Sequence, residues 1–315
     1  MQKNITSLGS LNWDDLKFFL EVARTRKASV AAKRLAVDYT TVSRRISSLE
    51  VSLGTLLFEK SRTNGFVLTP EGQRLLGYAE SIESTLHMAC EQVSGSGVAL
   101  SGHVRMGCTE GFGSFFVTPQ LSHFVDTYPA ISVDILPLPH FISLSKREAD
   151  ASVTIDRPTT DSFVTSKLTP YRLLPYATAD YLRQQGPIRD VSDLASLRWI
   201  DYVDDLLFTD QQVSLRKWLP SARSFLRSTS VIAQFQAARS GLGIALLPCF
   251  LASREPGLVP VLPDVVDVTR DFWLVAPAER RELARIKALW DYLRRVTELN
   301  QDFLMGQSAE IQWVP

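Results

Sequence analysis

The chain has 315 residues, of which 45% are hydrophobic, 10% aromatic and 22% charged. At about 150 residues per domain, this length suggests two domains, or three if one is small. The composition excludes a fibrous or mostly disordered chain, because enough apolar residues are present to form sizeable cores. No apolar run reaches the roughly 18 residues typical of a membrane helix, and no secretory signal is visible at the N-terminus.

The charge is unevenly distributed, although Lys plus Arg and Asp plus Glu each number 34. Residues 1–74 hold twelve basic and seven acidic side chains, a net +5, so the remaining 241 residues carry −5. A basic module joined to an acidic body is expected when only one module meets a polyanion. Three separated cysteines, Cys90, Cys108 and Cys249, with no CxxC pair, predict reduced thiols and a cytoplasmic protein.

Helical patterns dominate the first 53 residues. Apolar residues recur on one face of residues 13–23, Ser29 is expected to cap a helix over 30–35, and a third helix is expected over 40–53. The connection at 36–38 is too short for two antiparallel helices. The pattern therefore predicts a helix-turn-helix.

A hairpin and a long helix are expected next. Two extended segments flank Asn64-Gly65, which is a strong hairpin signal and predicts a wing. Thr69 is expected to cap the following helix, with Pro70 at its first position, and the Ser/Gly residues at 94–97 to end it as a flexible hinge.

The apolar residues of this long helix are spaced 4, 3, 4, 3 and 4 apart: Leu75, Ala79, Ile82, Leu86, Ala89 and Val93. This heptad spacing predicts a seam covered by the same helix of a second subunit. The alternative is an amphipathic helix that packs only on its own domain.

From Gly102 onward, strand-like and helix-like segments alternate, which predicts parallel sheets covered on both faces and arranged as two lobes. Strands are expected near 104–108, 132–136, 151–155, 173–177, 199–203, 243–247 and 272–275. Helices are expected near 115–127, 180–185, 211–219, 231–240 and 281–296, and the tail after Glu298 shows no pattern. We therefore expect an α+β multidomain protein with a helix-turn-helix domain (1–69), a linker helix and hinge (70–101), a two-lobed α/β domain (102–300) and a tail (301–315).

An ordered string of residues at the front carries a family resemblance: Trp13-Asp14-Asp15-Leu16, Ala31-Ala32, Thr41-Val42-Ser43-Arg44-Arg45-Ile46, Leu57-Phe58-Glu59-Lys60 and Leu68-Thr69-Pro70-Glu71-Gly72. A second string runs from Arg239 to Pro248 (RSGLGIALLP). From Trp13 to about Val296 the chain resembles the LysR-type transcriptional regulators. One departure is Asp38-Tyr39-Thr40, where the family commonly has Ser-Gln-Pro or Ser-Gln-Ser.

The resemblance implies a winged helix-turn-helix, a dimerising linker helix and a two-lobed effector domain similar to periplasmic binding proteins. The partners it implies are an operator in double-stranded DNA, a small-molecule effector and the chain itself, as a homodimer and then a homotetramer. We also expect contact with RNA polymerase and none with a membrane.

The recognition helix is expected to lie in the major groove, with its N-terminal residues nearest the bases. Outward-facing positions are expected for Tyr39, Thr40, Thr41, Ser43 and Arg44, where Arg44 could pair with guanine or a phosphate and the hydroxyl groups with either. Phosphate contacts are expected from Lys33, Arg45, Lys60 and Arg62. The alternative is that these side chains form only a solvated polar face.

The effector is expected between the lobes, where strands end and helices begin. Matching to the family pattern places there Thr109, Glu110, Phe112, Asp156, Arg157, Tyr202, Val203 and Ser230. Thr109 and Ser230 are expected to bind polar groups, and Phe112 and Tyr202 to form apolar walls. The alternative is ordinary turns in which Thr and Ser serve only as helix caps.

Three other classes of function are weighed against this interpretation. A redox regulator would use Cys108, which lies beside the expected site but has no paired cysteine nearby in sequence. An enzyme with a fused DNA-binding module is disfavoured, because no nucleophile elbow, Walker loop or dinucleotide loop occurs. A DNA-bending structural protein would not need the α/β body. The scattered histidines predict no metal site, and we expect no cofactor and no catalytic residues.

Overall fold

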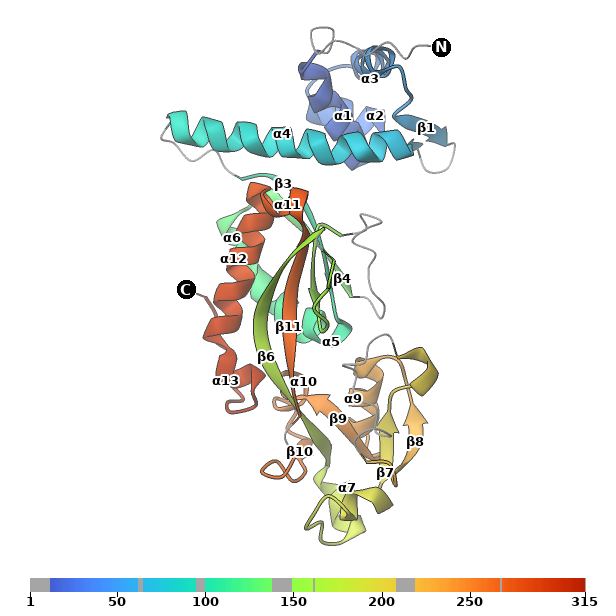
Figure 1. The fold of residues 1–315 in the computed structure, drawn as a ribbon, viewed down its shortest axis with the longest axis vertical. Coiled ribbons are helices and arrows are strands. Elements are labelled where there is room, and N and C mark those ends of the chain that lie inside the picture. The colour runs from blue at the N-terminus through green and yellow to red at the C-terminus, as the bar shows by residue number, and fades with distance from the viewer. Residues whose placement is uncertain are drawn as a thin grey trace. The chain divides into compact units, whose positions relative to one another are not determined.

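The computed structural model describes residues 12–61, 65–94, 100–137, 149–160, 162–207, 219–266 and 268–314. The chain divides into two units, Met1–Val98 and Ala99–Pro315. Each unit buries its own hydrophobic core, and Figure 1 labels the elements of both units.

The core of the first unit is built by the helices α1 (Asp14–Thr25), α2 (Ala28–Arg34) and α3 (Tyr39–Leu53). Phe19, Val42 and Leu49 are fully buried between them. Ser29 does not cap α2 as expected: the helix begins at Ala28, whose methyl group is buried, and Lys27 occupies the cap position.

The helix-turn-helix prediction is confirmed by the link between α2 and α3. Ala36 has a positive φ of 54°, and the Val37 amide donates to the Ala32 carbonyl (3.0 Å), which reverses the chain. Asp38 then caps α3 by accepting a hydrogen bond from the Thr41 amide.

The predicted wing is an antiparallel hairpin of β1 (Phe58–Ser61) and β2 (Gly65–Leu68). Gly65 has a φ of +72°, and a Cβ there would lie 2.3 Å from the Arg26 carbonyl oxygen. The Phe66 amide donates to this same oxygen (2.8 Å). A side chain at position 65 is therefore incompatible with the packing of the wing on the α1–α2 loop.

The long helix α4 (Pro70–Ser94) starts as predicted, with the Thr69 hydroxyl accepting from the Gly72 amide (3.0 Å). Its first turns join the core through Leu75 and the buried Ala79, so this part of the expected seam packs on its own domain. Further along, Ile82 and Leu86 are 40% and 64% exposed. The Val93 side chain and most of the expected hinge lie outside the described residues.

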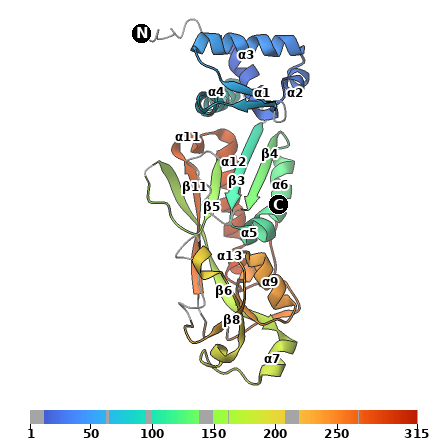
Figure 2. The ribbon, with the colours of Figure 1, turned by 90° about the vertical axis from the view of Figure 1, so that its right-hand side faces the viewer.

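The second unit contains one mixed sheet, with strand order β4-β3-β5-β11-β6-β9-β7-β8 and β10 beside β6. Figure 2 shows β4, β3, β5 and β11 side by side. Its strands are β3 (Gly102–Cys108), β4 (Ile131–Pro137), β5 (Ala151–Thr154), β6 (Phe163–Thr178), β7 (Arg198–Asp201), β8 (Arg223–Arg227), β9 (Ile244–Pro248), β10 (Leu258–Pro260) and β11 (Val268–Pro277). The sequence analysis missed β8 and β10.

The expectation of purely parallel sheets is wrong because of two long strands. β3 is parallel to β4 and β5, and β7 is parallel to β8 and β9. Between these sets, β6 and β11 pair antiparallel along ten residues and connect a first lobe (β3, β4, β5) to a second lobe (β7, β8, β9). These two strands are therefore the connections between the lobes.

The helical elements of this unit are α5 (Glu110–Phe112), η2 (Gly113–Val117), α6 (Thr118–Thr127), α7 (Ala179–Gln185), η4 (Asp193–Ser196), η5 (Asp204–Leu206), α9 (Val231–Arg239), α10 (Cys249–Ala252), α11 (Ala278–Arg281), α12 (Ala284–Leu299) and α13 (Gln301–Leu304). The helix expected at 211–219 falls almost wholly outside the described residues.

The tail is ordered by packing rather than by a local pattern. Phe303, Leu304 and Val314 are buried. The Asn300 side-chain amide makes two hydrogen bonds with the backbone of Gln312. Its Nδ2 donates to the Gln312 carbonyl (2.9 Å), and its Oδ1 accepts from the Gln312 backbone N–H (2.6 Å).

Candidate nucleic-acid interface and effector site

The first turn of α3 exposes Tyr39 and Thr40, and Arg44 is exposed one turn later. Val42 and Ile46 are buried on the opposite face, as predicted. The Asp38 carboxylate accepts from the Thr41 amide (2.7 Å) and from the hydroxyl groups of Thr40 (2.5 Å) and Thr41 (2.9 Å).

Two of the expected DNA contacts are directed into the protein instead. The Ser43 Oγ is buried, so this hydroxyl does not face outward. Arg45 pairs with the buried Asp15 (3.0 Å) and with Asp14 (3.7 Å), and its guanidinium lies 5.4 Å from the Phe18 ring centre. Arg45 therefore connects α3 to α1, and we remove it and Ser43 from the predicted DNA contacts.

Of the expected phosphate contacts, Lys33 is exposed at the end of α2. The Lys60 side chain and Arg62 lie outside the part of the chain that the structure describes. The wing that carries them is anchored by Glu50, whose carboxylate accepts from the Leu57 (2.8 Å) and Phe58 (3.2 Å) amides. Sequence analysis did not find this role, because Glu50 and its partners are separated by a turn.

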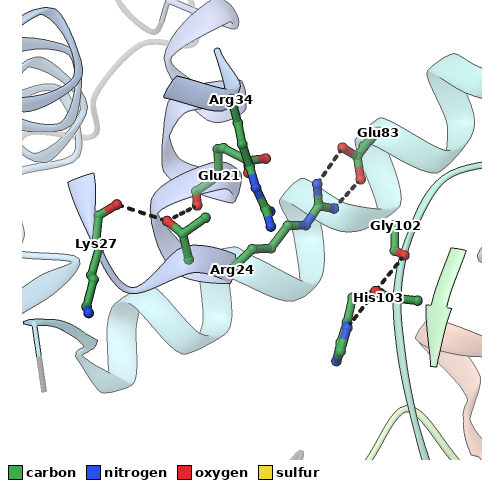
Figure 3. Close-up of polar contacts among 9 residues, drawn as sticks. Glu21, Arg24, Lys27, Arg34, Glu83, Gly102 and His103 are labelled. Atoms are coloured by element: carbon green, nitrogen blue, oxygen red, sulfur yellow. Dashed lines mark hydrogen bonds and ion pairs between the residues drawn. The ribbon is translucent and has the colours of Figure 1, made fainter. Parts of the chain in front are cut away.

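The direction of α4 against α1 is fixed by a two-point ion pair between Arg24 and Glu83 (Figure 3). The two nitrogen–oxygen distances are 3.1 and 2.5 Å, and both side chains are largely buried. Starting next to Glu83, the exposed Ile82, Leu86 and Ala89 form an apolar strip on α4.

The two lobes of the second unit meet where α5 follows β3 and where α9 begins. A Cβ at Gly111 would lie 3.0 Å from Val231 Cγ1, so the first turn after β3 touches the first residue of α9. Thr109 and Ser230 occupy the cap positions of these helices. Ser230 Oγ accepts from the Ala233 amide (3.1 Å), whereas the Thr109 side chain makes no cap bond.

Tyr171, on the connecting strand β6, brings further expected residues together. Burial raises its pKa, the nearby Tyr202 and Asp156 raise it further, and Arg270 lowers it. Tyr202 belongs to the second lobe and Asp156 follows β5 of the first, so groups from both lobes act electrostatically on one buried phenol. We define Thr109, Asp156, Tyr171, Tyr202 and Ser230 as the lobe junction.

Phe112 is not the apolar wall that the sequence analysis expected. It is fully buried, and its ring contacts Phe116, Phe250 and Phe272 at centroid distances of 5.1, 5.6 and 4.2 Å. Tyr171 stacks on Phe272 at 4.1 Å and 13°. Phe116 is only four residues away, but Phe250 and Phe272 come from distant segments, and no local sequence signal identifies those two.

The remaining expected residues lie at the edges of the junction. Arg157 is exposed, with its guanidinium 5.4 Å from the Trp273 ring centre. Glu110 and Val203 are half-buried. A separate polar hollow of about 320 Å³ lies at β7 and β8, lined by residues that include Asp201, Asp204, Arg223 and Arg227; none of the expected effector residues lines it.

Cys108 and Cys249 are buried. Burial raises the pKa of Cys108 to about 12, which disfavours the thiolate that a redox sensor needs. Among the described residues, no three His, Cys, Asp or Glu side chains are arranged to hold a metal. No helix within the same residues has the length and apolar character to cross a membrane.

The two units correspond to two modules of one family. Residues 13–73 match the bacterial regulatory helix-turn-helix proteins of the lysR family, and residues 98–298 match the LysR substrate binding domain. The chain therefore belongs to the LysR family of transcriptional regulators, with a DNA-binding module followed by an effector-binding domain.

Relatives and solved structures agree with this assignment. The chain is 26% identical over 300 residues to the HTH-type transcriptional regulator PtxR of Pseudomonas aeruginosa, covering 93% of this chain and 96% of that protein. The fold is similar to that of the LysR-type regulator CrgA from Neisseria meningitidis (21% identity, TM-score 0.56, 90% and 98% covered). It is also similar to full-length LysG from Corynebacterium glutamicum with bound effector Arg. The sequence identity is 18% and the TM-score is 0.55, and the match covers 90% of this chain and 97% of that chain. The interpretation as a regulator rather than an enzyme agrees with the names of these relatives.

Proposed function

We propose that this protein is a sequence-specific regulator that reads DNA through the first two turns of α3 and is switched by a small molecule bound at the lobe junction. The observation that carries the proposal is that both lobes contribute to this junction: Gly111 of the first lobe touches Val231 of the second, and Asp156 and Tyr202 lie beside Tyr171. A ligand held by both lobes would stabilise one arrangement of the lobes over another, which is what a switch requires.

The charges at the junction bear on the ligand class. Glu110 and Asp156 are acidic, and Arg157 is the basic group expected to offset them. We therefore propose a small effector recognised through hydroxyl and amide hydrogen bonds rather than a polyanion. The bound Arg in LysG supports a small-molecule effector for this fold. We further propose a cytoplasmic homodimer that assembles as a homotetramer and contacts RNA polymerase on its operator.

Arg44→Ala is expected to weaken binding to the cognate operator by about 1–3 kcal/mol and binding to random duplex by little, because a base contact carries sequence information. Arg74→Ala is the matched control, since Arg74 is exposed on α4 and pairs with Glu71. Fluorescence anisotropy with both duplexes provides the measurement. An equal loss on cognate and random DNA would place Arg44 on a phosphate instead.

Ser230→Ala and Thr109→Val are expected to weaken effector binding about five- to tenfold each, since each removes one hydrogen-bonding group. An effector is first identified by a thermal-shift screen of metabolites, in which a ligand at 100 times its Kd adds about 2.7 kcal/mol. Thr178→Ala is the control for Ser230→Ala, because the Thr178 hydroxyl caps α7 by accepting from the Tyr181 amide in the same way. If both junction variants bind the effector like the parent, the ligand lies elsewhere.

A further inference from the structure

The recognition helix of this protein begins with a carboxylate that two hydroxyl groups contact. Thr40 and Thr41 each donate their hydroxyl hydrogen to Asp38, and the Thr41 amide donates as well. These hydrogen bonds hold the pKa of Asp38 at about 2, although the side chain is fully exposed, so the carboxylate is ionised at every physiological pH.

The number of hydrogens fixes what the two threonine hydroxyl groups of this turn offer to DNA. A hydroxyl group has one hydrogen and two acceptor lone pairs, and an ionised carboxylate only accepts. Since both threonine hydrogens are used on Asp38, their free positions are acceptors. The next exposed group, Arg44, is a donor one turn further along.

The bases differ in what they present to such acceptors in the major groove. Adenine N6 and cytosine N4 are amino donors, whereas guanine presents only the acceptors N7 and O6. Acidic side chains accordingly accept from cytosine N4, and an acceptor placed against another acceptor, or against a phosphate, is repulsive.

We propose that Asp38 sets the hydrogen-bond polarity of the first turn of α3, so that this turn selects a base with an exocyclic amino group and rejects guanine. The inference rests on the proposed DNA-reading role of α3, and it specifies which bases are preferred at one position of the operator half-site. The operator half-site then has adenine or cytosine opposite the first turn of α3, followed by the group that Arg44 contacts.

The test is selection of bound duplexes from a randomised library by the full-length protein and three variants. Asp38→Asn keeps a good helix cap but replaces one carboxylate oxygen by an amide donor, which turns the Thr41 hydroxyl hydrogen outward. Asp38→Ser keeps a helix cap, but its side chain has one oxygen in place of two. One of the two threonine hydroxyl groups then loses its acceptor and becomes free to donate to a base. Glu71→Gln, in the first turn of α4, removes the same charge away from α3.

Wild type and Glu71→Gln are expected to enrich adenine or cytosine at one position of each half-site. Asp38→Asn is expected to change the preference there toward guanine or thymine by about five- to 150-fold, the range of one base contact, and Asp38→Ser to lose the preference. The proposal is overturned if Asp38→Asn keeps the wild-type base preference at every position. This holds even if the variant binds all duplexes more tightly than the wild type does. It is also overturned if folded Asp38→Asn binds no DNA. Should the wild type enrich no sequence, the proposed DNA-reading function itself fails.

Discussion

Replacing Ile82 and Leu86 by glutamate is expected to lower the affinity for an operator with two half-sites by about two to four orders of magnitude. Both side chains are exposed on the part of α4 that extends beyond the core contacts of Leu75 and Ala79. If this apolar strip joins two subunits, four carboxylates brought together would separate them, and each DNA-binding module would bind alone. Binding of the second module to its half-site would then no longer benefit from the high effective concentration that the link between the two subunits provides.

Anisotropy titrations on DNA with one and with two half-sites, combined with light scattering, measure this effect. Binding to a single half-site is expected to change little, because Ile82 and Leu86 lie outside the α1–α3 core. Leu299→Glu, an exposed leucine near the end of α12, is the control. A variant that keeps both its oligomer size and its affinity for the full operator would show that the strip on α4 does not join subunits.

Arg280→Met is expected to lower the free energy of unfolding of the second unit by about 3–5 kcal/mol, because it leaves a buried carboxylate without its counter-charge. Arg280 pairs with Asp150, and their side chains are only 7% and 8% exposed. The same carboxylate accepts from the Arg105 amide (2.8 Å), which connects the start of β5 to β3.

Urea unfolding followed by tryptophan fluorescence gives the measurement. Arg183→Met is the matched control, since it breaks an exposed ion pair with Asp180 and is expected to cost less than about 1 kcal/mol. Adding Asp150→Asn to Arg280→Met should recover part of the loss, because the amide oxygen still accepts from Arg105 while the charge is removed. A loss for Arg280→Met no larger than that of the control would contradict this role of the pair.

The local signals in the sequence predicted the first unit well. The helix-turn-helix, the hairpin of the wing and the Thr69-Pro70 helix start are confirmed by the structure. Each depends on contacts within a few residues, so the sequence window that carries the signal also contains the partner.

Side-chain partners across the fold were not predictable in the same way. Arg45 and Ser43 lie on the recognition helix, yet one contacts Asp15 of α1 and the hydroxyl of the other is buried. Phe112 follows a strand as an effector residue would, but it packs among aromatic rings from three other segments. Helical periodicity indicates which face is inward, and it does not identify the groups on the facing element.

The sequence by itself determined most of the elements, though not β8 and β10, together with the DNA-binding module, the family and the basic front end. It could do so because hydrophobic period, capping residues and charge are local properties of the chain. Only the tertiary structure decided that β6 and β11 pair antiparallel and connect the lobes, that groups from both lobes act on the pKa of Tyr171, and that the tail packs through Asn300. These features depend on pairing between residues far apart in sequence, and strand direction and side-chain contacts are set by the packing of the whole unit rather than by any one segment.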